Sequence, residues 1–338
     1  SVVAGWSLYY LEVMRGDELS AASPPVVAAH FQNLLESPVL QLKWQSIFLA
    51  VLVAVLAFGV RRGLGALVWL VVPVMITLLG LLVKYALDNG DLAAAREFLF
   101  NVQMVDFTRE SVLAAMGHAL FTLGVGVGAG IAYGAYAPSR IPIGRSVMAV
   151  AVFDTIIALL AGIAIFPVIF VNNLAPSSGP GLLFITVPYA FGNAPQGELF
   201  GSLFFAMTVV AALGFSAALM EPAVSMLQQQ LRLRRVTAVL IAGAIAWLLA
   251  WAVSASLGPR GWFGMQDLMH KLDFLTANIL LPLVCLLTAI LVGWRLNKAV
   301  LRPQLARESN LSFSLWHALL RYIAPVAIAL IVLAGLNG

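Results

Sequence analysis

Four glycines alternate along one apolar stretch of the chain, and they indicate a backbone that can bind a ligand directly. The stretch is FTLGVGVGAGIAYGAY, Phe121–Tyr136, and its alternating glycines are Gly124, Gly126, Gly128 and Gly130. Alternate residues cannot share one helix face, as a small-residue packing stripe requires, and each glycine costs about 1 kcal/mol relative to alanine inside a helix. We therefore expect the helix to unwind here and to offer carbonyls and amides to a ligand. Close helix packing is the alternative explanation.

One carboxylate lies well inside an apolar segment. Asp154 occurs in VAVFDTIIALLAG, and an ionised carboxylate at the bilayer centre costs roughly 2.5–3.5 kcal/mol on insertion scales. No lysine or arginine lies at comparable depth in the apolar segments, so a bound cation or a proton is the expected compensation. In the alternative, a protonated Asp154 hydrogen-bonds Thr155 or a neighbouring helix.

A second acid, Glu221, directly precedes Pro222 in ALMEPAVSM. Its carboxylate could serve a water pathway near the inner end of its segment or help to fix a kinked helix, and we favour the structural role. The four histidines lack metal-ligand spacing, and HExxH, GxSxG, Walker A and CxxC motifs are absent from the sequence. The chain is therefore not expected to be an enzyme or a redox carrier.

The elements that position these residues are expected to be membrane-spanning helices. Of 338 residues, 62% are hydrophobic and 10% charged, whereas soluble domains have about 45–50% apolar and about 25% charged residues. Strand-like alternation is missing, so the fold class is all-α and polytopic. Segments long enough to cross about 30 Å of hydrocarbon lie at residues 44–60, 65–86, 112–136, 145–171, 200–228, 236–257, 274–294 and 315–336. Residues 1–14 are too short to cross and are expected to be the outer end of a helix whose beginning is missing.

The loops predict an orientation and three structured outer segments. One set of alternating loops is rich in arginine and lysine with Glu308 as its only acid, and the other set holds most of the acids. The basic set is therefore cytoplasmic and the C-terminus outside, and the net charge of +4 predicts no nucleic-acid partner. Outer segments 15–43 and 87–111 can contain short amphipathic helices. Segment 172–199 is expected to pack back as a lid or re-entrant hairpin, the alternative being an exposed loop.

Several stretches, taken in order, resemble the neurotransmitter:sodium symporter family, in particular bacterial amino-acid transporters with the leucine-transporter fold. GHALFTLGVGVGAGIAYGAY resembles the unwound sixth helix, DTIIALLAGIAIFP the seventh, and GPGLLFITVPYAFGNAPQGELFGSLFF the lid loop and eighth helix. The resemblance implies an inverted-repeat fold and a bacterial inner membrane. In the single domain 1–338, residues 1–14 correspond to part of helix three, 44–86 to helices four and five, 112–294 to the second repeat with helices six to ten, and 315–336 to helix eleven.

The resemblance also implies a sodium-coupled symporter of an amino acid or related small amine. Its substrate pocket is expected to involve Phe121, Gly124, Val125, Val127 and Phe215. Sodium ligands are expected at Thr122, Asp154 and Ala211, and gates at Tyr136 and Asp273. An acid at Asp154 resembles variants in which a carboxylate replaces chloride. Sodium is therefore the expected coupling ion, with chloride not required and no other cofactor.

The chain also departs from the family pattern. Helices one and two and the start of three are not found, so a missing N-terminal segment or a second copy of the chain is an expected partner besides the lipid bilayer. Gly214 and Phe215 stand where the family has hydroxyl ligands of a second sodium, and Gln229 where it has an inner-gate acid. These departures favour a second hypothesis, a truncated transporter-like subunit that acts as a scaffold or partner without transport. They also predict that the 338 residues alone do not catalyse coupled transport.

Overall fold

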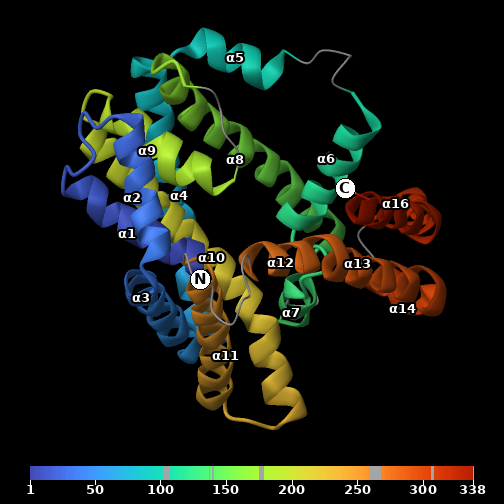
Figure 1. The fold of residues 1–338 in the computed structure, drawn as a ribbon. Helices are drawn as coiled ribbons and strands as arrows, with labels where there is room; N and C mark the ends of the chain where they lie inside the picture. The colour runs from blue at the N-terminus through green and yellow to red at the C-terminus, as the bar shows by residue number, and fades with distance from the viewer. Residues whose placement is uncertain are drawn as a thin grey trace. The chain divides into compact units, whose positions relative to one another are not determined.

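A computed structural model describes residues 1–101, 107–136, 138, 141–174, 179–258, 268–305 and 308–337, and these contain helices and connecting segments but no strand. The chain divides into two compact units (Figure 1). Unit 1 comprises Ser1–Asn101 and Ala158–Met269, and unit 2 comprises Val102–Ile157 and His270–Gly338. Residues 102–106 and 175–178 of the expected outer segments lie outside the described residues.

Seven helical segments of the described chain are long and apolar enough to cross a membrane. Three are the single helices α8 (Ile143–Val171), α10 (Gly197–Gln230) and α11 (Arg235–Ser256), and a fourth is α3 (Pro38–Ala57). The other three combine α-helices with single turns of π-helix. The first joins η1 (Val60–Leu64) to α4 (Gly65–Asn89). The second runs through α12 (Leu268–Phe274), η5 (Leu275–Leu280), α13 (Leu281–Ile290) and η6 (Leu291–Arg295), and the third through α15 (Asn310–Ala318), η7 (Leu319–Ile323) and α16 (Ala324–Asn337). The all-α membrane fold is therefore confirmed. The expected span 112–136 consists of two helices, α6 (Arg109–Thr122) and α7 (Ala129–Tyr136), with the alternating glycines between them.

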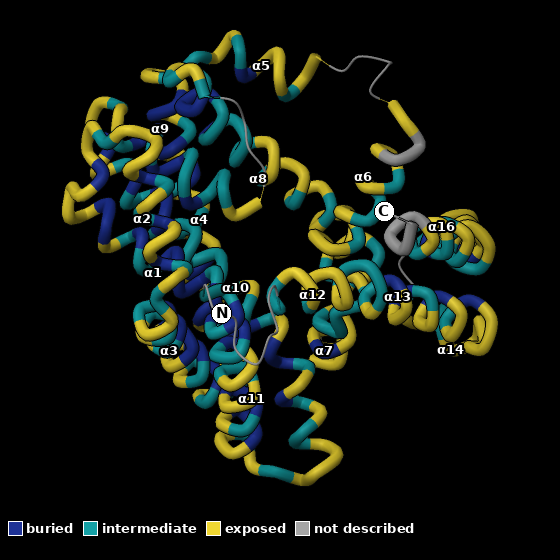
Figure 2. The backbone as a smooth tube through the Cα atoms, viewed as in Figure 1, coloured by how far each residue is buried: buried dark blue, intermediate teal, exposed yellow. Residues whose placement is uncertain are grey.

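The core of unit 1 forms around α1 (Val2–Arg15), which packs against α3 and α10. Trp6 and Tyr10 of α1 are almost completely buried, and Figure 2 shows buried positions repeating along this helix. Gly5 permits the close approach of α3, because a Cβ there would lie 2.7 Å from the backbone nitrogen of Gln45. The indole nitrogen of Trp6 donates a hydrogen bond to Oε1 of Gln41 at 3.2 Å, which gives this buried donor a partner. Residues 1–14 therefore form a packed core helix.

The apolar part of segment 172–199 folds back into unit 1. It contains a π-helical turn, η3 (Leu182–Thr186), followed by α9 (Val187–Gly192). Phe184 is fully buried, with its ring stacked on Phe31 at 5.5 Å and edge-on to Trp6 at 5.6 Å. Such aromatic contacts add to the packing of an otherwise irregular segment. The predicted inward packing is confirmed, and the exposed-loop alternative is wrong for the described residues.

Short helices occupy the other two outer segments, as predicted. α2 (Pro24–Glu36) buries Val27, Phe31 and Leu34 on one side. α5 (Leu92–Phe100) begins at Asp91, whose carboxylate accepts hydrogen bonds from the N–H groups of Ala93 and Ala94. This is the usual way in which an N-cap aspartate satisfies the first amides of a helix.

α2 carries a half-buried histidine whose neutral form is favoured by its surroundings. His30 stacks on Tyr9, and its Nε2 shares a 2.7 Å hydrogen bond with the Tyr9 hydroxyl. Burial lowers the pKa of His30, and the negative charge of Glu18 opposes this shift only in part. Since the unfolded chain then binds more protons than the folded one, acidification must favour unfolding.

We therefore expect the protein to lose thermal stability as the pH falls through about 6.5, the ordinary pKa of histidine. The midpoint of thermal unfolding, measured on purified protein in detergent at pH 7.5 and 5.5, should fall more for the native chain than for His30→Gln. Equal falls for the two proteins would show that His30 does not contribute.

Candidate functional site

The helix that carries the alternating glycines is interrupted over residues 123–128. α6 ends at Thr122 and α7 begins at Ala129. Gly124, Gly126 and Gly128 have φ values of +63°, +87° and +85°, which lie in the left-handed region that glycine adopts without steric penalty. The predicted unwinding is therefore confirmed. Its predicted extension to Gly130 is wrong, because Gly130 lies within α7.

Irregular hydrogen bonds accompany this break. The N–H of Val125 donates to the carbonyl of Leu120 at 3.1 Å, and the N–H of Val127 donates to the carbonyl of Gly124 at 3.4 Å. These bonds reach back five and three residues, whereas a regular α-helix uses four throughout. The carbonyls of the break are thus re-aimed relative to a straight helix, which is the property that lets broken membrane helices coordinate ions.

The two side chains predicted to bind sodium in unit 2 are hydrogen-bonded to each other. Oγ1 of Thr122, the last residue of α6, donates to Asp154 of α8 at 3.0 Å from Oδ1 and 3.3 Å from Oδ2. The neighbouring Thr155 donates instead to the carbonyl of Ala151. A carboxylate and a hydroxyl lie in contact where the unwound segment begins, one residue after Thr122. Such oxygen atoms are the ligands that a hard cation prefers.

The remaining predicted site residues divide between the two units. Phe121, Gly124, Val125 and Val127 belong to unit 2 and flank or form the break, and Tyr136 ends α7 in the same unit. Asp273 lies in α12 of unit 2, whereas Ala211 and Phe215 lie in α10 of unit 1. A Cβ at Gly124 would have no atom of the described structure within 4 Å, so open space adjoins the break at this point.

α10 explains why a glycine stands at position 214. A Cβ at Gly214 would lie 3.3 Å from Cγ1 of Val71 in α4, so a larger residue would require a small shift of the Val71 side chain. Small residues are the usual means by which membrane helices approach closely. Packing in unit 1 therefore accounts for Gly214, which replaces an expected hydroxyl ligand.

The break is fixed against α13 by a contact that the sequence does not reveal. A Cβ at Gly126 would lie 2.6 Å from Sγ of Cys285 and 2.8 Å from the carbonyl oxygen of Leu281. Cys285 is buried in the apolar core of unit 2 with Ala289 and Ile328. Gly126 is therefore required both for its backbone conformation and for the space that it leaves.

We expect Gly126→Ala to reduce transport at least about tenfold, because the added methyl group meets backbone and sulfur atoms as well as the left-handed penalty of about 1–2 kcal/mol. Gly59→Ala is the matched control, since the φ of Gly59 is also positive, open space surrounds it and it lies outside the proposed site. Initial uptake rates, corrected for the amount of folded protein, make the comparison. A loss as large in Gly59→Ala as in Gly126→Ala would contradict the role of the Cys285 contact.

The start of α8, which carries Asp154, rests against Glu308. A Cβ at Gly144 would lie 2.8 Å from Oε1 of Glu308, and this oxygen is buried without a hydrogen-bond partner in the described structure. Arg302 holds the segment in place by donating to the carbonyls of Leu305 and Glu308 at 2.8 and 3.0 Å. Glu308 therefore lies at the first turn of α8, where the helix dipole favours a negative charge. The sequence identified Glu308 only as a loop acid.

Glu221 has a structural role, as favoured from its position before Pro222. It is completely buried in α10 and forms a two-pronged ion pair with Arg235 of α11, at 2.9 Å from Nη1 to Oε1 and 2.8 Å from Nη2 to Oε2. Nε of Arg235 also donates to the carbonyl of Leu56 at the end of α3. The pair therefore joins three helices of unit 1. The sequence does not reveal this partner, because Arg235 stands there among the basic residues between two apolar segments.

A family model, a curated relative and a solved structure each match this chain over nearly its whole length. A model described as the sodium:neurotransmitter symporter family matches residues 30–337. The chain is 31% identical over 339 residues to the uncharacterized sodium-dependent transporter YhdH of Bacillus subtilis, which covers 98% of this chain and 75% of YhdH. It is 27% identical over 232 residues to sodium-dependent nutrient amino acid transporter 1 of Drosophila grimshawi, covering 64% of this chain and 35% of that protein. The crystal structure of MhsT in complex with L-phenylalanine superposes with a TM-score of 0.88 at 31% identity, over 99% of this chain and 77% of that one.

Proposed function

Because the chain belongs to the sodium:neurotransmitter symporter family, whose members are sodium-coupled transporters and not enzymes, we propose that it imports an amino acid with sodium. The observation that carries this proposal is the contact between Thr122 and Asp154 beside the unwound glycine segment. The pair places a carboxylate and a hydroxyl at the end of α6, where the unwound segment begins. Such an arrangement binds a monovalent cation and can present the same broken backbone to a zwitterionic substrate.

The proposed substrate is an apolar or aromatic amino acid. MhsT was crystallised with L-phenylalanine, and the Drosophila relative is named for amino acids. In this chain Gly124 adjoins open space and Val127 is smaller than the aromatic residue common in the family. Phe121, Val125 and Phe215 are the further proposed pocket residues, with Tyr136 and Asp273 as gates. The assignments of 112–294 to the second repeat and 315–336 to helix eleven remain predictions.

One sodium site is proposed, at Thr122 and Asp154, and it does not require chloride. The carboxylate supplies the negative charge that chloride would otherwise provide. At the second expected site, Ala211 retains a backbone carbonyl, but Gly214 and Phe215 offer no hydroxyl. The sodium dependence of uptake is therefore expected to have a Hill coefficient near one.

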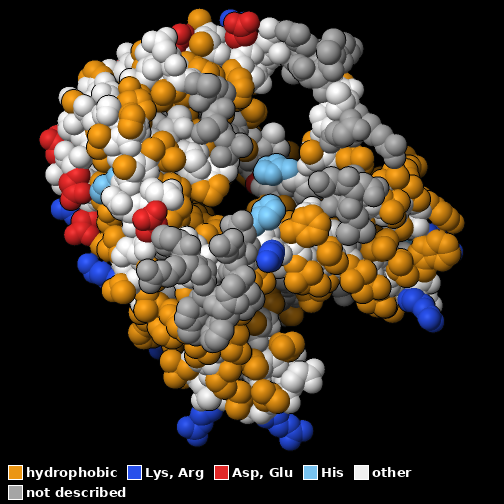
Figure 3. Space-filling view, in the orientation of Figure 1, with side chains coloured by type: hydrophobic (Ala, Val, Ile, Leu, Met, Phe, Trp, Pro, Cys, Tyr) orange, Lys and Arg blue, Asp and Glu red, His pale blue; other side chains and the backbone are white. Residues whose placement is uncertain are grey.

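We propose that the chain lies in a bacterial inner membrane with its basic loops inside and its C-terminus outside. Figure 3 supports this orientation for unit 1, since lysine and arginine side chains mark the end where α10 connects to α11. The acidic side chains in this view lie away from that end, and basic ones also occur among them. An end that shows basic and no acidic side chains is what the positive-inside rule expects of a cytoplasmic face.

The test is reconstitution of the whole gene product in proteoliposomes with an inward sodium gradient and a panel of labelled amino acids. We expect at least one apolar or aromatic amino acid to accumulate. Its accumulation should disappear when potassium replaces sodium and should persist when gluconate replaces chloride. A Hill coefficient near two would contradict the single-site assignment. No accumulation of any amino acid would favour the alternative, a transporter-like scaffold, which the residues at Gly214 and Phe215 support.

A further inference from the structure

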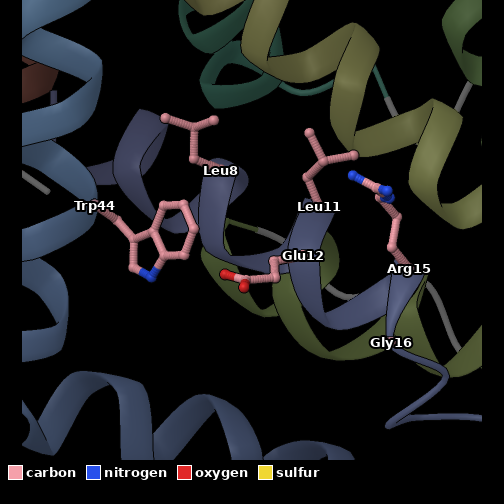
Figure 4. Close-up of a pocket in the computed structure, with 6 residues that line it drawn as sticks. All are labelled: Leu8, Leu11, Glu12, Arg15, Gly16 and Trp44. Atoms are coloured by element: carbon pink, nitrogen blue, oxygen red, sulfur yellow. The ribbon is translucent and has the colours of Figure 1, made fainter.

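A groove outside the proposed sodium and substrate residues lies between α1 and α3 of unit 1. Its volume is about 480 Å³, and it is lined by Leu8, Leu11, Glu12, Arg15, Gly16 and Trp44 (Figure 4). In the close-up Glu12 reaches from α1 toward the indole of Trp44, whereas Arg15 extends beyond Leu11 in another direction. The groove therefore presents a negative and a positive group at separate positions along an apolar floor.

Glu12 and Arg15 are both exposed and lie three residues apart on α1, so both project within one helical turn. A carboxylate binds best to a cation that donates N–H hydrogen bonds, and a guanidinium binds best to a phosphate or carboxylate. A ligand that satisfies both groups carries an ammonium and an anionic oxygen group in one molecule.

Trp44 provides an independent indication of a ligand. Its indole Nε1 is buried and has no hydrogen-bond partner in the described structure. The ammonium of Lys43 lies 4.7 Å from the centroid of the same indole ring. A buried N–H without an acceptor is unfavourable by about 1–3 kcal/mol. Because Nε1 has almost no accessible surface, an acceptor oxygen in the groove can remove this penalty only after the indole of Trp44 turns toward it.

The groove also has the polarity gradient of a membrane interface. Leu8 lies two turns before Arg15 on α1, so the lining changes from apolar to charged along the helix. On α3, Ile47 and Val51 follow Trp44 and are 42% and 47% exposed. Tryptophan, lysine and arginine beside exposed aliphatic residues are typical of the headgroup level of a bilayer. An amphiphile fits this gradient, whereas a free amino acid leaves the exposed aliphatic residues of α3 uncovered.

We propose that this groove binds one phospholipid whose headgroup carries a primary ammonium and a phosphate, as in phosphatidylethanolamine. Its ammonium donates hydrogen bonds to Glu12, its phosphate pairs with Arg15, and an ester oxygen accepts from Nε1 of Trp44 once the indole has turned toward the groove. An acyl chain lies along Leu8 and the exposed side of α3. A trimethylammonium headgroup is disfavoured because it has no N–H to donate to the carboxylate.

Native mass spectrometry of the whole, delipidated gene product tests the proposal by titration with phosphatidylethanolamine, phosphatidylcholine or phosphatidylglycerol of identical acyl chains. We expect one tightly retained phosphatidylethanolamine, bound at least about tenfold more tightly than phosphatidylcholine, as the loss of one charge-assisted hydrogen bond predicts. Glu12→Gln should abolish this preference, Arg15→Gln should weaken both zwitterionic lipids, and Trp44→Phe should weaken both while keeping the aromatic ring.

Asp88→Asn is the matched control, because it removes an exposed carboxylate from the end of α4 outside the groove. It should bind lipids as the native protein does. Equal binding of phosphatidylethanolamine and phosphatidylcholine by the native protein would overturn the proposal, as would an unchanged preference in Glu12→Gln. Displacement of the lipid by millimolar phenylalanine would identify the groove as an amino-acid site instead. If Glu12→Gln does not fold, the loss of binding in Arg15→Gln and Trp44→Phe remains decisive.

Discussion

Sodium-driven uptake is expected to fall at least about tenfold in Asp154→Asn when chloride is absent, and to recover in part when chloride is supplied. The carboxylate of Asp154 is half-buried and accepts a hydrogen bond from Thr122 at the end of α6. Its replacement by a neutral amide keeps the shape and the acceptor oxygen but removes the charge that balances a bound cation. A mobile chloride can replace part of that charge. Initial uptake rates in proteoliposomes, with chloride or gluconate as the anion, measure the effect.

Two further variants separate the charge of Asp154 from its hydrogen bond. Thr122→Val removes the hydroxyl with little change in volume, and it should weaken the apparent sodium affinity without creating a chloride requirement. Asp88→Asn, which changes an exposed carboxylate at the end of α4, should leave uptake unchanged. Native uptake by Asp154→Asn in both anions would exclude Asp154 from the sodium site.

The largest loss of stability is expected from Arg235→Met. Glu221 is fully buried, whereas the Arg235 side chain is 17% exposed, so loss of the arginine removes the two-pronged ion pair of an enclosed carboxylate. Removing one partner of a buried ion pair costs about 3–5 kcal/mol. The carbonyl of Leu56 loses a donor as well. A clear fall in the thermal unfolding midpoint in detergent is therefore expected.

Glu221→Leu should be less harmful than Arg235→Met, because the partly exposed guanidinium can still reach water. The double variant Glu221→Leu/Arg235→Met should recover part of the loss, since it leaves no buried charge. Unfolding midpoints of the three variants, measured in the same detergent, give the order. A double variant that is less stable than either single one would show that the helices depend on the arginine for more than charge balance.

Local sequence was sufficient for features that depend on one segment. The alternation of glycines predicted the break because left-handed backbone and the loss of helical bonding are properties of the segment itself. The aromatic and apolar middle of 172–199 predicted inward packing for the same reason, and Phe184 is fully buried. The extent of the break was less predictable. Gly130 has the same local composition around it but lies within α7, because the following residues continue the helix.

Composition and apolar length determined by themselves that this is an all-α membrane protein, and the order of motifs determined the family resemblance. Which side chains meet was decided only by the tertiary structure. Thr122 and Asp154 are 32 residues apart and belong to different helices. Glu221 and Arg235 also belong to different helices. Helical periodicity specifies which face a residue occupies, but the partner of that face depends on how the helices cross and how closely they approach. Gly5, Gly126 and Gly214 lie close to neighbouring helices, where a Cβ would meet other atoms. The sequence shows that a glycine is present, but it does not show which helix will lie against it.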